Sequence, residues 1–283
     1  MYRKAPASAG VFLLYAYYLR MDKDLAWLID EKYGGSTENK AQLRVDMNRL
    51  AIGEPVAYVI GWQPFLGLNI HLDSKPLIPR PETEWWAEEL IKELDPKRVA
   101  PTHHRLPKGP ALLRSGYPLR VLDLCAGSGA VGCAILKHVP NVHVTFAELV
   151  PEHEATIWKN IKENGLDESR AEVRIGDLFA PVAGEKFDII ATNPPYIPEE
   201  RELDRSVTNF EPRTALRAGA DGLSIIDRIA AEAPAHLNAG GELWLECDSE
   251  HADAARERIA AHATRAELRT DPYGRPRIVV GYY

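Results

Sequence analysis

The tetrapeptide Asn193-Pro194-Pro195-Tyr196 has the residue types and spacing that best fit a chemical role in this chain. It directly follows Asp188–Thr192, whose apolar centre Ile189-Ile190-Ala191 predicts a strand. The Asn193 side-chain oxygen and the main-chain carbonyl at Pro194 can accept the two N–H groups of an amide or arylamine, which frees and aims the nitrogen lone pair. The two prolines fix φ and carry no N–H, so the turn is stiff. The arrangement predicts methylation of a planar nitrogen by positioning alone, with Tyr196 stacked on the amide or base.

A glycine-rich loop earlier in the chain predicts a ligand-binding site. The apolar residues 121–124 predict a strand, and a helix is expected to begin near residue 129. Glycines let the backbone approach a ligand closely, and a helix N-terminus presents free amides and partial positive charge. The loop between strand and helix consists of Cys125, Ala126, Gly127, Ser128 and Gly129.

The same loop fits two classes of cofactor. Gly127, Gly129 and Gly132 satisfy the G-x-G-x-x-G spacing of dinucleotide-binding proteins, and the acidic Glu148 follows about 20 residues later. Asp123 at the strand end would repel a pyrophosphate, but it suits the ammonium and sulfonium end of S-adenosylmethionine. Glu148 fits either cofactor as an acceptor for ribose hydroxyls.

The Asn-Pro-Pro-Tyr turn favours S-adenosylmethionine, because a nicotinamide enzyme has no use for it. Asp177, after the third predicted strand, can accept from the adenine amine while Leu178 lies against the ring, although an Asp in this place is often only a helix cap. The remaining alternatives are structural: a tight glycine turn without a ligand, and a Pro-Pro turn that only ends a strand.

Alternating strand and helix patterns from residue 119 onward supply the framework for these motifs. Such alternation predicts an α/β fold with a parallel sheet covered by helices on both faces. Since ligands of these sheets bind at the carboxyl ends of the strands, the loop and the turn are expected to lie side by side. The predicted strands span 119–124, 142–148, 171–175, 187–192, 242–247 and 278–283, and the predicted helices lie near 129–138, 151–164, 222–237 and 250–262.

The region before residue 119 has a different pattern. Helical spacing over 9–50 predicts a small helical domain, and alternation in 56–60 and 68–72 predicts a hairpin. Thr83 is expected to start a helix that continues through Leu94. The expected parts are a helical docking domain 1–53, a linker hairpin 54–79 and a catalytic domain 80–283.

Composition excludes several classes of protein. The 283 residues are 45% apolar and 27% charged, as in a soluble globular protein, and the net charge of −7 gives no broad basic face. Three cysteines cannot build a disulfide scaffold, no CxxC or HExxH spacing supports a metal site, and His103-His104 in the proline-rich loop 95–118 is expected to be solvated. The apolar run Val11–Leu19 is too short to span a bilayer and lacks a cleavage site, which predicts a buried helix. We expect a cytoplasmic monomer without metal or membrane.

Further segments narrow the assignment, because the Asn-Pro-Pro-Tyr turn alone is shared with nucleic-acid amino-methyltransferases. They are Gly53–Gly61, Leu77–Glu84, Phe210-Glu211-Pro212, Ala215-Leu216, Gly219 with Asp221–Leu223, and Asp271, Gly274, Arg275 and Arg277–Val279. With these segments, nearly the whole chain resembles the HemK/PrmC-type N5-glutamine methyltransferases.

The resemblance implies a seven-stranded, Rossmann-like class I S-adenosylmethionine-dependent methyltransferase sheet behind the helical domain. It implies methylation of the Gly-Gly-Gln glutamine of class I peptide-chain release factors, which the helical domain helps to dock. The substrate glutamine would lie on Asn193–Tyr196. The residues expected at the cofactor are 125–129, Glu148, Asp177, Leu178 and Asn193.

Several positions depart from the family pattern or have two interpretations. Cys125 and Ala126 stand where Gly and Thr are usual, and Glu246-Cys247-Asp248 replaces a Glu followed by small or apolar residues. The helical domain is shorter than usual and the 95–118 loop is longer. Arg80 and Glu211 are candidates for substrate binding, or else an ion pair that positions its loops.

Three other functions remain open from the sequence. One is methylation of adenine or cytosine amines in nucleic acid, which the charge of −7 and the absence of a Lys/Arg run disfavour. Another is methylation of a glutamine in a ribosomal protein. The third is a methyltransferase-like fold that only binds a partner, which the intact turn and loop disfavour.

Overall fold

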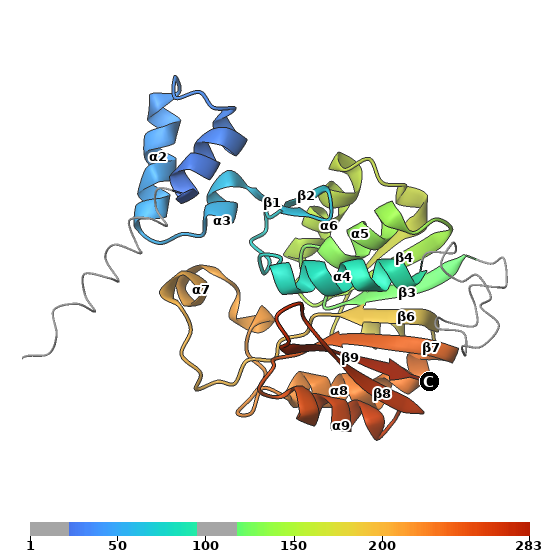
Figure 1. The fold of residues 1–283 in the computed structure, drawn as a ribbon. Helices are drawn as coiled ribbons and strands as arrows, with labels where there is room; N and C mark the ends of the chain where they lie inside the picture. Colours follow the sequence, from blue (N-terminus) through green and yellow to red (C-terminus); the bar gives the residue numbers. More distant parts are fainter. Residues whose placement is uncertain (1–22, 95–117) are drawn as a thin grey trace, which may run out of the picture. The chain divides into compact units, whose positions relative to one another are not determined.

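The computed structural model describes residues 23–94 and 118–283, so the expectations for Val11–Leu19 and for His103-His104 fall outside the described residues. The chain divides into two compact units (Figure 1). One extends up to Trp62 and includes Leu203–Phe210; the other comprises Gln63–Glu202 and Glu211–Tyr283. The sequence predicts an earlier end of the helical domain, at residue 53.

The first unit is helical. Residues 23–33 form a helix, followed by α2 (Lys40–Ala51) and α3 (Val56–Ile60), and α7 (Arg205–Phe210) groups with them. The helix 23–33, α2 and α3 share an apolar cluster of Leu28, Leu50, Val59 and Ile60.

The strand predicted over 56–60 is wrong, because these residues form α3. The helix follows Pro55 and ends at Gly61, whose φ of 103° stops it. All four residues Ala57–Ile60 are buried, so an apparent alternation of apolar residues does not separate strand from helix in so short a run.

The hairpin comprises β1 (Trp62–Phe65) and β2 (Leu68–His71); the second strand lies where predicted, and the first lies after the predicted 56–60. Its turn, Leu66-Gly67, has positive φ at both residues, 46° and 76°, as two-residue hairpin turns require. Asn160 of α6 (Glu152–Glu163) holds β2, because its Oδ1 accepts from His71 N–H at 2.6 Å while its Nδ2 donates to His71 O at 3.1 Å.

The second unit contains a seven-stranded sheet of order β5-β4-β3-β6-β7-β9-β8. β3 to β7 pair in parallel, whereas β9 pairs antiparallel with both β7 and β8. The strands are β3 (Leu119–Leu124), β4 (Val142–Glu148), β5 (Ala171–Ile175), β6 (Phe187–Thr192), β7 (Leu237–Glu246), β8 (Arg265–Thr270) and β9 (Pro276–Tyr282). The predicted bounds of β3, β4, β5 and β6 are confirmed. β7 and β9 were predicted with shifted ends, and β8 is the strand of this sheet that the sequence did not predict.

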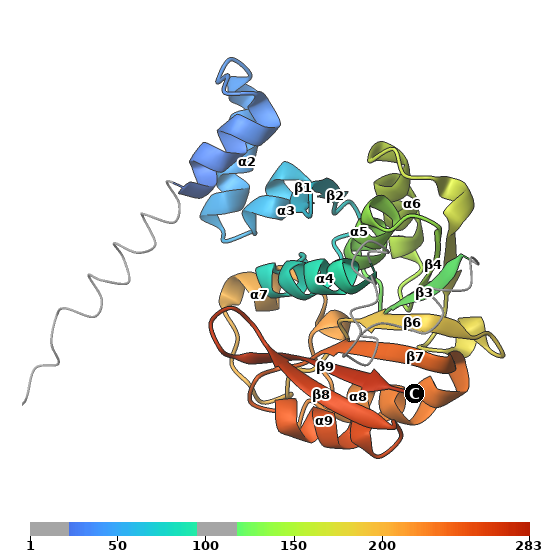
Figure 2. The same ribbon diagram turned by 45° about the vertical axis from the view of Figure 1, so that its right-hand side comes forward.

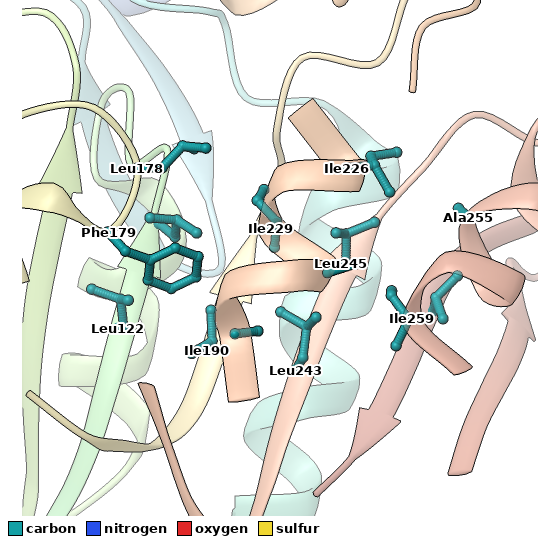
Figure 3. Packing of buried hydrophobic residues seen from close by; sticks show 14 of the residues in the cluster. Leu122, Leu178, Phe179, Ile190, Ile226, Ile229, Leu243, Leu245, Ala255 and Ile259 are labelled. Carbon is teal, nitrogen blue, oxygen red and sulfur yellow. The ribbon is translucent and has the colours of Figure 1, made fainter. Parts of the chain in front are cut away.

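Helices cover both faces of this sheet (Figures 1 and 2). α4 (Pro81–Leu94), α5 (Ala130–His138) and α6 lie on one side, and α8 (Ser224–Glu232) and α9 (Ala252–Ala260) lie on the other. Figure 3 shows Ile226, Ile229 and Ile259 of α8 and α9 in one buried cluster with strand residues such as Leu243 and Leu245. No helix in the described ranges has the length and apolar character needed to cross a bilayer.

Helix α5, which follows the glycine-rich loop, packs closely on the sheet because residue 132 is a glycine. An added Cβ at Gly132 would lie 2.2 Å from Phe146 Cε1 and 2.9 Å from Asp123 Oδ2. Any larger residue would push α5 away from β3 and β4.

We therefore expect Gly132→Ala to lower the free energy of unfolding by about 1–3 kcal/mol, the usual cost of overpacking a core. Urea denaturation measures this loss in the free energy of unfolding. The same substitution is also made in a Phe146→Leu protein, in which the clashing ring is absent. The penalty should shrink in that background; an equal penalty in both would show that packing against Phe146 is not the cause.

Candidate active site

An open cavity, about 770 Å³ when the solvent-filled mouth is included, lies at the carboxyl ends of the central strands of the sheet. Seven of the residues predicted for the site line it: Cys125, Gly127, Glu148, Asp177, Leu178, Asn193 and Pro195. Other residues predicted for the site lie outside its lining: Arg80, Asp123, Ala126, Ser128, Gly129, Pro194, Tyr196 and Glu211. The structure thus brings the glycine loop and the Asn-Pro-Pro-Tyr turn to one cavity.

The glycine loop is held by the carboxylate of Glu148. Gly127 N–H donates to Glu148 Oε2 at 2.7 Å, and Val150 N–H donates to Oε1 at 2.9 Å. Gly127 and Gly129 have φ of 57° and 76°, in the left-handed region that glycine enters without strain. At Gly127 an added Cβ would find only Pro76 Cβ within reach, at 4.0 Å, so the missing side chain leaves the cavity open.

Cys125 adopts φ of 60°, which explains why glycine is usual there in the family it resembles. A non-glycine residue in this region costs on the order of 1 kcal/mol. Burial raises the pKa of the Cys125 thiol to about 12, and the charge of Glu148 acts in the same direction. The thiol is therefore protonated at neutral pH and lines the cavity as a small apolar group.

Asp123 lies beneath the loop, not at the cavity. It is buried, and its Oδ2 accepts from Gly132 N–H in the first turn of α5 at 2.8 Å. This bond satisfies one of the free amides at the helix N-terminus. A contact between Asp123 and the ammonium of a cofactor stays a prediction.

Asp177 and Leu178 line the cavity from the loop after β5. Asp177 forms an exposed ion pair with Arg228 of α8 at 2.7 Å. Leu178 has φ of 47° and is buried against the core cluster that α8 also joins. The strained backbone keeps an apolar side chain at the cavity wall.

The Asn-Pro-Pro-Tyr turn is anchored by hydrogen bonds to buried groups. Asn193 Nδ2 donates to Thr83 Oγ1 at 3.1 Å, and Tyr196 Oη donates to Glu246 Oε1 at 2.9 Å. Burial, followed by the charge of Glu246, raises the pKa of Tyr196 well above its ordinary value. Tyr196 packs partly against the core, and its hydroxyl is hydrogen-bonded to Glu246. Both contacts hold the turn in place.

Arg80 and Glu211 form an ion pair at 2.6 Å, and the Glu211 carboxylate also accepts from Ile78 N–H at 3.2 Å. These contacts join the segment containing Leu77 to the one containing Thr214, and both of these residues line the cavity. The geometry is that of an ion pair that positions loops, the second of the two interpretations.

The sequence did not reveal the remaining lining residues, which come from β4, α6, α8 and the connecting segments. They are Leu77, Ala147, Leu149, Val150, His153, Gly176, Thr214, Ala215, Arg217 and Ile225. His153 is bonded through Nδ1 to Ser74 Oγ at 2.9 Å, and burial lowers its pKa, so it is neutral at pH 7. Within residues 23–94 and 118–283 no cluster of three His, Cys, Asp or Glu side chains could hold a metal ion.

A family model described as "Methyltransferase small domain" matches residues 103–256 of this chain. Curated proteins named release factor glutamine methyltransferase also match. The protein from Streptococcus pneumoniae is 33% identical over 87% of this chain and 81% of its own length. Those from Koribacter versatilis and Xylella fastidiosa are 32% and 33% identical, covering 95% and 96% of this chain and 89% and 91% of their own lengths.

Solved structures share the fold at low sequence identity. A methyltransferase from Pyrococcus furiosus superposes with a TM-score of 0.52 at 15% identity, over 87% of this chain and 98% of that one. A 16S rRNA methyltransferase from T. thermophilus, solved with AdoMet and guanosine, superposes with a TM-score of 0.52 at 17% identity, over 78% of this chain and 49% of that one. The second unit therefore has the fold of class I methyltransferases, as the sequence predicts.

The position of Asp123 generates a pH-dependent prediction. Burial raises its pKa to about 8, although the Gly132 N–H bond opposes the shift. In the unfolded chain an Asp titrates near ~3.9, so the folded state binds one more proton between the two values. Its contribution to stability is complete below the unfolded pKa and is lost as the pH rises through about 8.

Asp123→Asn keeps an acceptor for Gly132 N–H but cannot titrate. We expect the wild type to lose stability relative to this variant as the pH rises from 4 to about 8. Urea unfolding of both proteins at several pH values measures the difference. A difference that stays constant over this range would contradict a protonated Asp123.

Proposed function

This chain belongs to the release factor glutamine methyltransferase family, and from that membership we propose that it transfers a methyl group from S-adenosylmethionine to the side-chain amide nitrogen of a protein glutamine. The observation that carries the proposal is that Asn193 and Pro195 line the same cavity as Gly127 and Glu148. A turn suited to an amide nitrogen thus opens on the space suited to the methyl donor.

The residues at the cavity fit S-adenosylmethionine. A carboxylate oxygen accepts about two hydrogen bonds. Because Glu148 Oε1 and Oε2 each accept one backbone N–H, each retains one acceptor position for a ribose hydroxyl. Leu149, Leu178 and Ile225 give the cavity apolar walls for an adenine ring. Asp177, despite its ion pair, keeps acceptor capacity for the adenine amine.

The turn accounts for the choice of an amide nucleophile. When bound, S-adenosylmethionine supplies an electrophilic methyl group. Asn193 Oδ1 and the carbonyl of Pro194 accept the two N–H groups of the glutamine amide and direct the nitrogen lone pair into the cavity. The prolines hold both acceptors in place because their φ is fixed. No side chain has to remove a proton before methyl transfer, since the methylated nitrogen becomes strongly acidic and loses its proton afterwards.

The proposed target is the Gly-Gly-Gln glutamine of class I peptide-chain release factors, in line with the names of the curated relatives. The helical segment up to residue 53 is proposed to dock that partner, since every chemical motif lies beyond it. A monomeric state and a cytoplasmic location stay predictions.

The proposal is tested with the full chain and labelled S-adenosylmethionine. Purified release factor, ribosomes and DNA are offered in parallel, and the modified residue is mapped. We expect label on the release-factor glutamine, and none on a release factor in which that glutamine is replaced by glutamate. Label on a ribosomal protein would redirect the target, whereas label on DNA would overturn glutamine as the acceptor.

The proposed ribose contact of Glu148 gives a prediction about cofactor binding. Glu148→Ala should weaken binding of S-adenosylmethionine by roughly 1–3 kcal/mol, the scale of hydrogen bonds to a charged group. Isothermal titration measures it, with Glu172→Ala, an exposed change on the neighbouring strand β5, as the control. Tight binding of a nicotinamide dinucleotide by the wild type, without binding of the methyl donor, would reject this reading.

The proposed role of Asn193 gives a prediction about the rate of methyl transfer. Asn193→Ala removes one acceptor from the substrate nitrogen and should lower kcat on the order of 10²-fold or more, as loss of one preorganised polar contact does. Asn193→Asp keeps an acceptor but adds charge that favours the cationic ground state, so its rate should fall between those of Ala and wild type. Single-turnover transfer at saturating cofactor measures both, and cofactor affinity should change much less than the rate. An Ala variant with near-normal turnover would remove the proposed role of the turn.

A further inference from the structure

We propose that Glu246 and Thr83 form a positioning relay that orients the Asn193 amide, so that its oxygen and not its nitrogen faces the substrate. The inference rests on the proposed function, because it concerns the group that holds the glutamine amide. Neither Glu246 nor Thr83 lines the cavity. They act through Asn193 and are positioning residues.

Glu246 is a buried carboxylate that three side chains share as an acceptor. It is the last residue of β7 and is 1% exposed. Its Oε2 accepts from Thr83 Oγ1 at 2.7 Å and from Trp86 Nε1 at 2.6 Å. Its Oε1 accepts from Tyr196 Oη at 2.9 Å.

The sheet register places this carboxylate beside the turn. Leu245 of β7 pairs with Thr192 of β6, and these residues immediately precede Glu246 and Asn193. Thr83 lies in the first turn of α4, where the sequence predicts a cap. The helix instead begins at Pro81, and the Thr83 hydroxyl is free to contact Glu246 and Asn193.

When Glu246 is ionised, counting protons fixes the direction of every bond in the relay. Burial raises the pKa of Glu246, and the hydrogen bonds from Trp86, Thr83 and Tyr196 oppose that shift. An ionised carboxylate only accepts, and a threonine hydroxyl has one proton to donate. Since Thr83 donates that proton to Glu246, Thr83 Oγ1 can only accept from Asn193. The contact of 3.1 Å must therefore come from Asn193 Nδ2. Asn193 Oδ1 is left on the other side of the amide as an acceptor.

Trp86 limits what an amide could do in place of Glu246. Its Nε1 can only donate, and it shares Glu246 Oε2 with Thr83. In Glu246→Gln the amide oxygen therefore stays at Trp86 and Thr83, and the amide nitrogen faces Tyr196 Oη, which can accept. Glu246→Gln thus keeps the direction of the relay, and Thr83→Val is the change that breaks it.

The test compares substitutions of nearly equal size. Thr83→Val removes the hydroxyl, and we expect it to lower kcat roughly 10- to 100-fold, as misplacement of a substrate-positioning group does. Glu246→Gln keeps an oxygen at Thr83 and Trp86 and should retain most of kcat. Thr83→Ser keeps the hydroxyl and should retain most of kcat. The KM for S-adenosylmethionine should stay within about twofold of wild type in all three, because the cofactor loop is unchanged.

A matched control separates positioning from stability. Thr156→Val also removes the hydroxyl of a buried threonine, which bonds Ser74 Oγ at 2.7 Å, and it lies outside the relay. Urea denaturation gives the stability of each variant. A kcat that follows stability across Thr83→Val, Thr83→Ser and Thr156→Val would overturn the proposal, as would normal turnover in Thr83→Val.

A second readout needs no activity. In a ¹⁵N spectrum, the side-chain NH₂ signals of Asn193 are identified by their loss in Asn193→Asp. One of these protons should be protected from solvent exchange in wild type and Thr83→Ser, and exposed in Thr83→Val. If the wild type transfers no methyl group to glutamine but shows this pattern, the proposed function fails and the relay stands. If it methylates glutamine but the Asn193 protons respond to none of the substitutions, the relay fails and the function stands.

Discussion

The parallel pairing of β3 with β6 is the constraint on which the site depends. Leu124 is opposite Thr192, and Thr192 Oγ1 donates to Leu124 O at 2.7 Å, so the two strands end together. The residue after each strand begins a motif: Cys125 opens the glycine loop and Asn193 opens the rigid turn. A shift of register by one residue would separate loop from turn and reverse which side chains face the core.

Much of the fold could be predicted because the central strands are buried on both faces. β6 is buried at every position, and its apolar centre Ile189-Ile190-Ala191 is typical of a strand inside a parallel sheet. β8 was missed for the opposite reason: it is an edge strand whose residues, among them Arg265, Glu267 and Arg269, are exposed or half-buried. Its pairing with β9 is a tertiary contact that leaves no apolar pattern in the sequence.

Site residues that lie within one sequence motif could be predicted. Site residues that come together only through folding, from distant parts of the chain, could not. Glu148 was found because an acid at the end of the second strand has a regular place in such sheets. Leu77 and Arg217 line the same cavity from loops 140 residues apart (217 − 77). The shared acceptor Glu246 stands in a stretch that departs from the family pattern, and only the structure shows that Thr83, Trp86 and Tyr196 converge on it.

The grouping of Leu203–Phe210 with the helical unit changes what it means to separate the two units. The chain passes from one to the other after Trp62, after Glu202 and again after Phe210, so three covalent connections join them. A protease that cuts after Trp62 would leave the segment up to Trp62 without a covalent link, while Leu203–Phe210 stays joined to the other unit at both ends. Two of these connections flank α7 and lead back to the Asn-Pro-Pro-Tyr turn on one side and to Glu211 and Thr214 on the other. The helical unit is therefore built from two separate segments of the chain, and the N-terminal segment alone does not make up the whole unit.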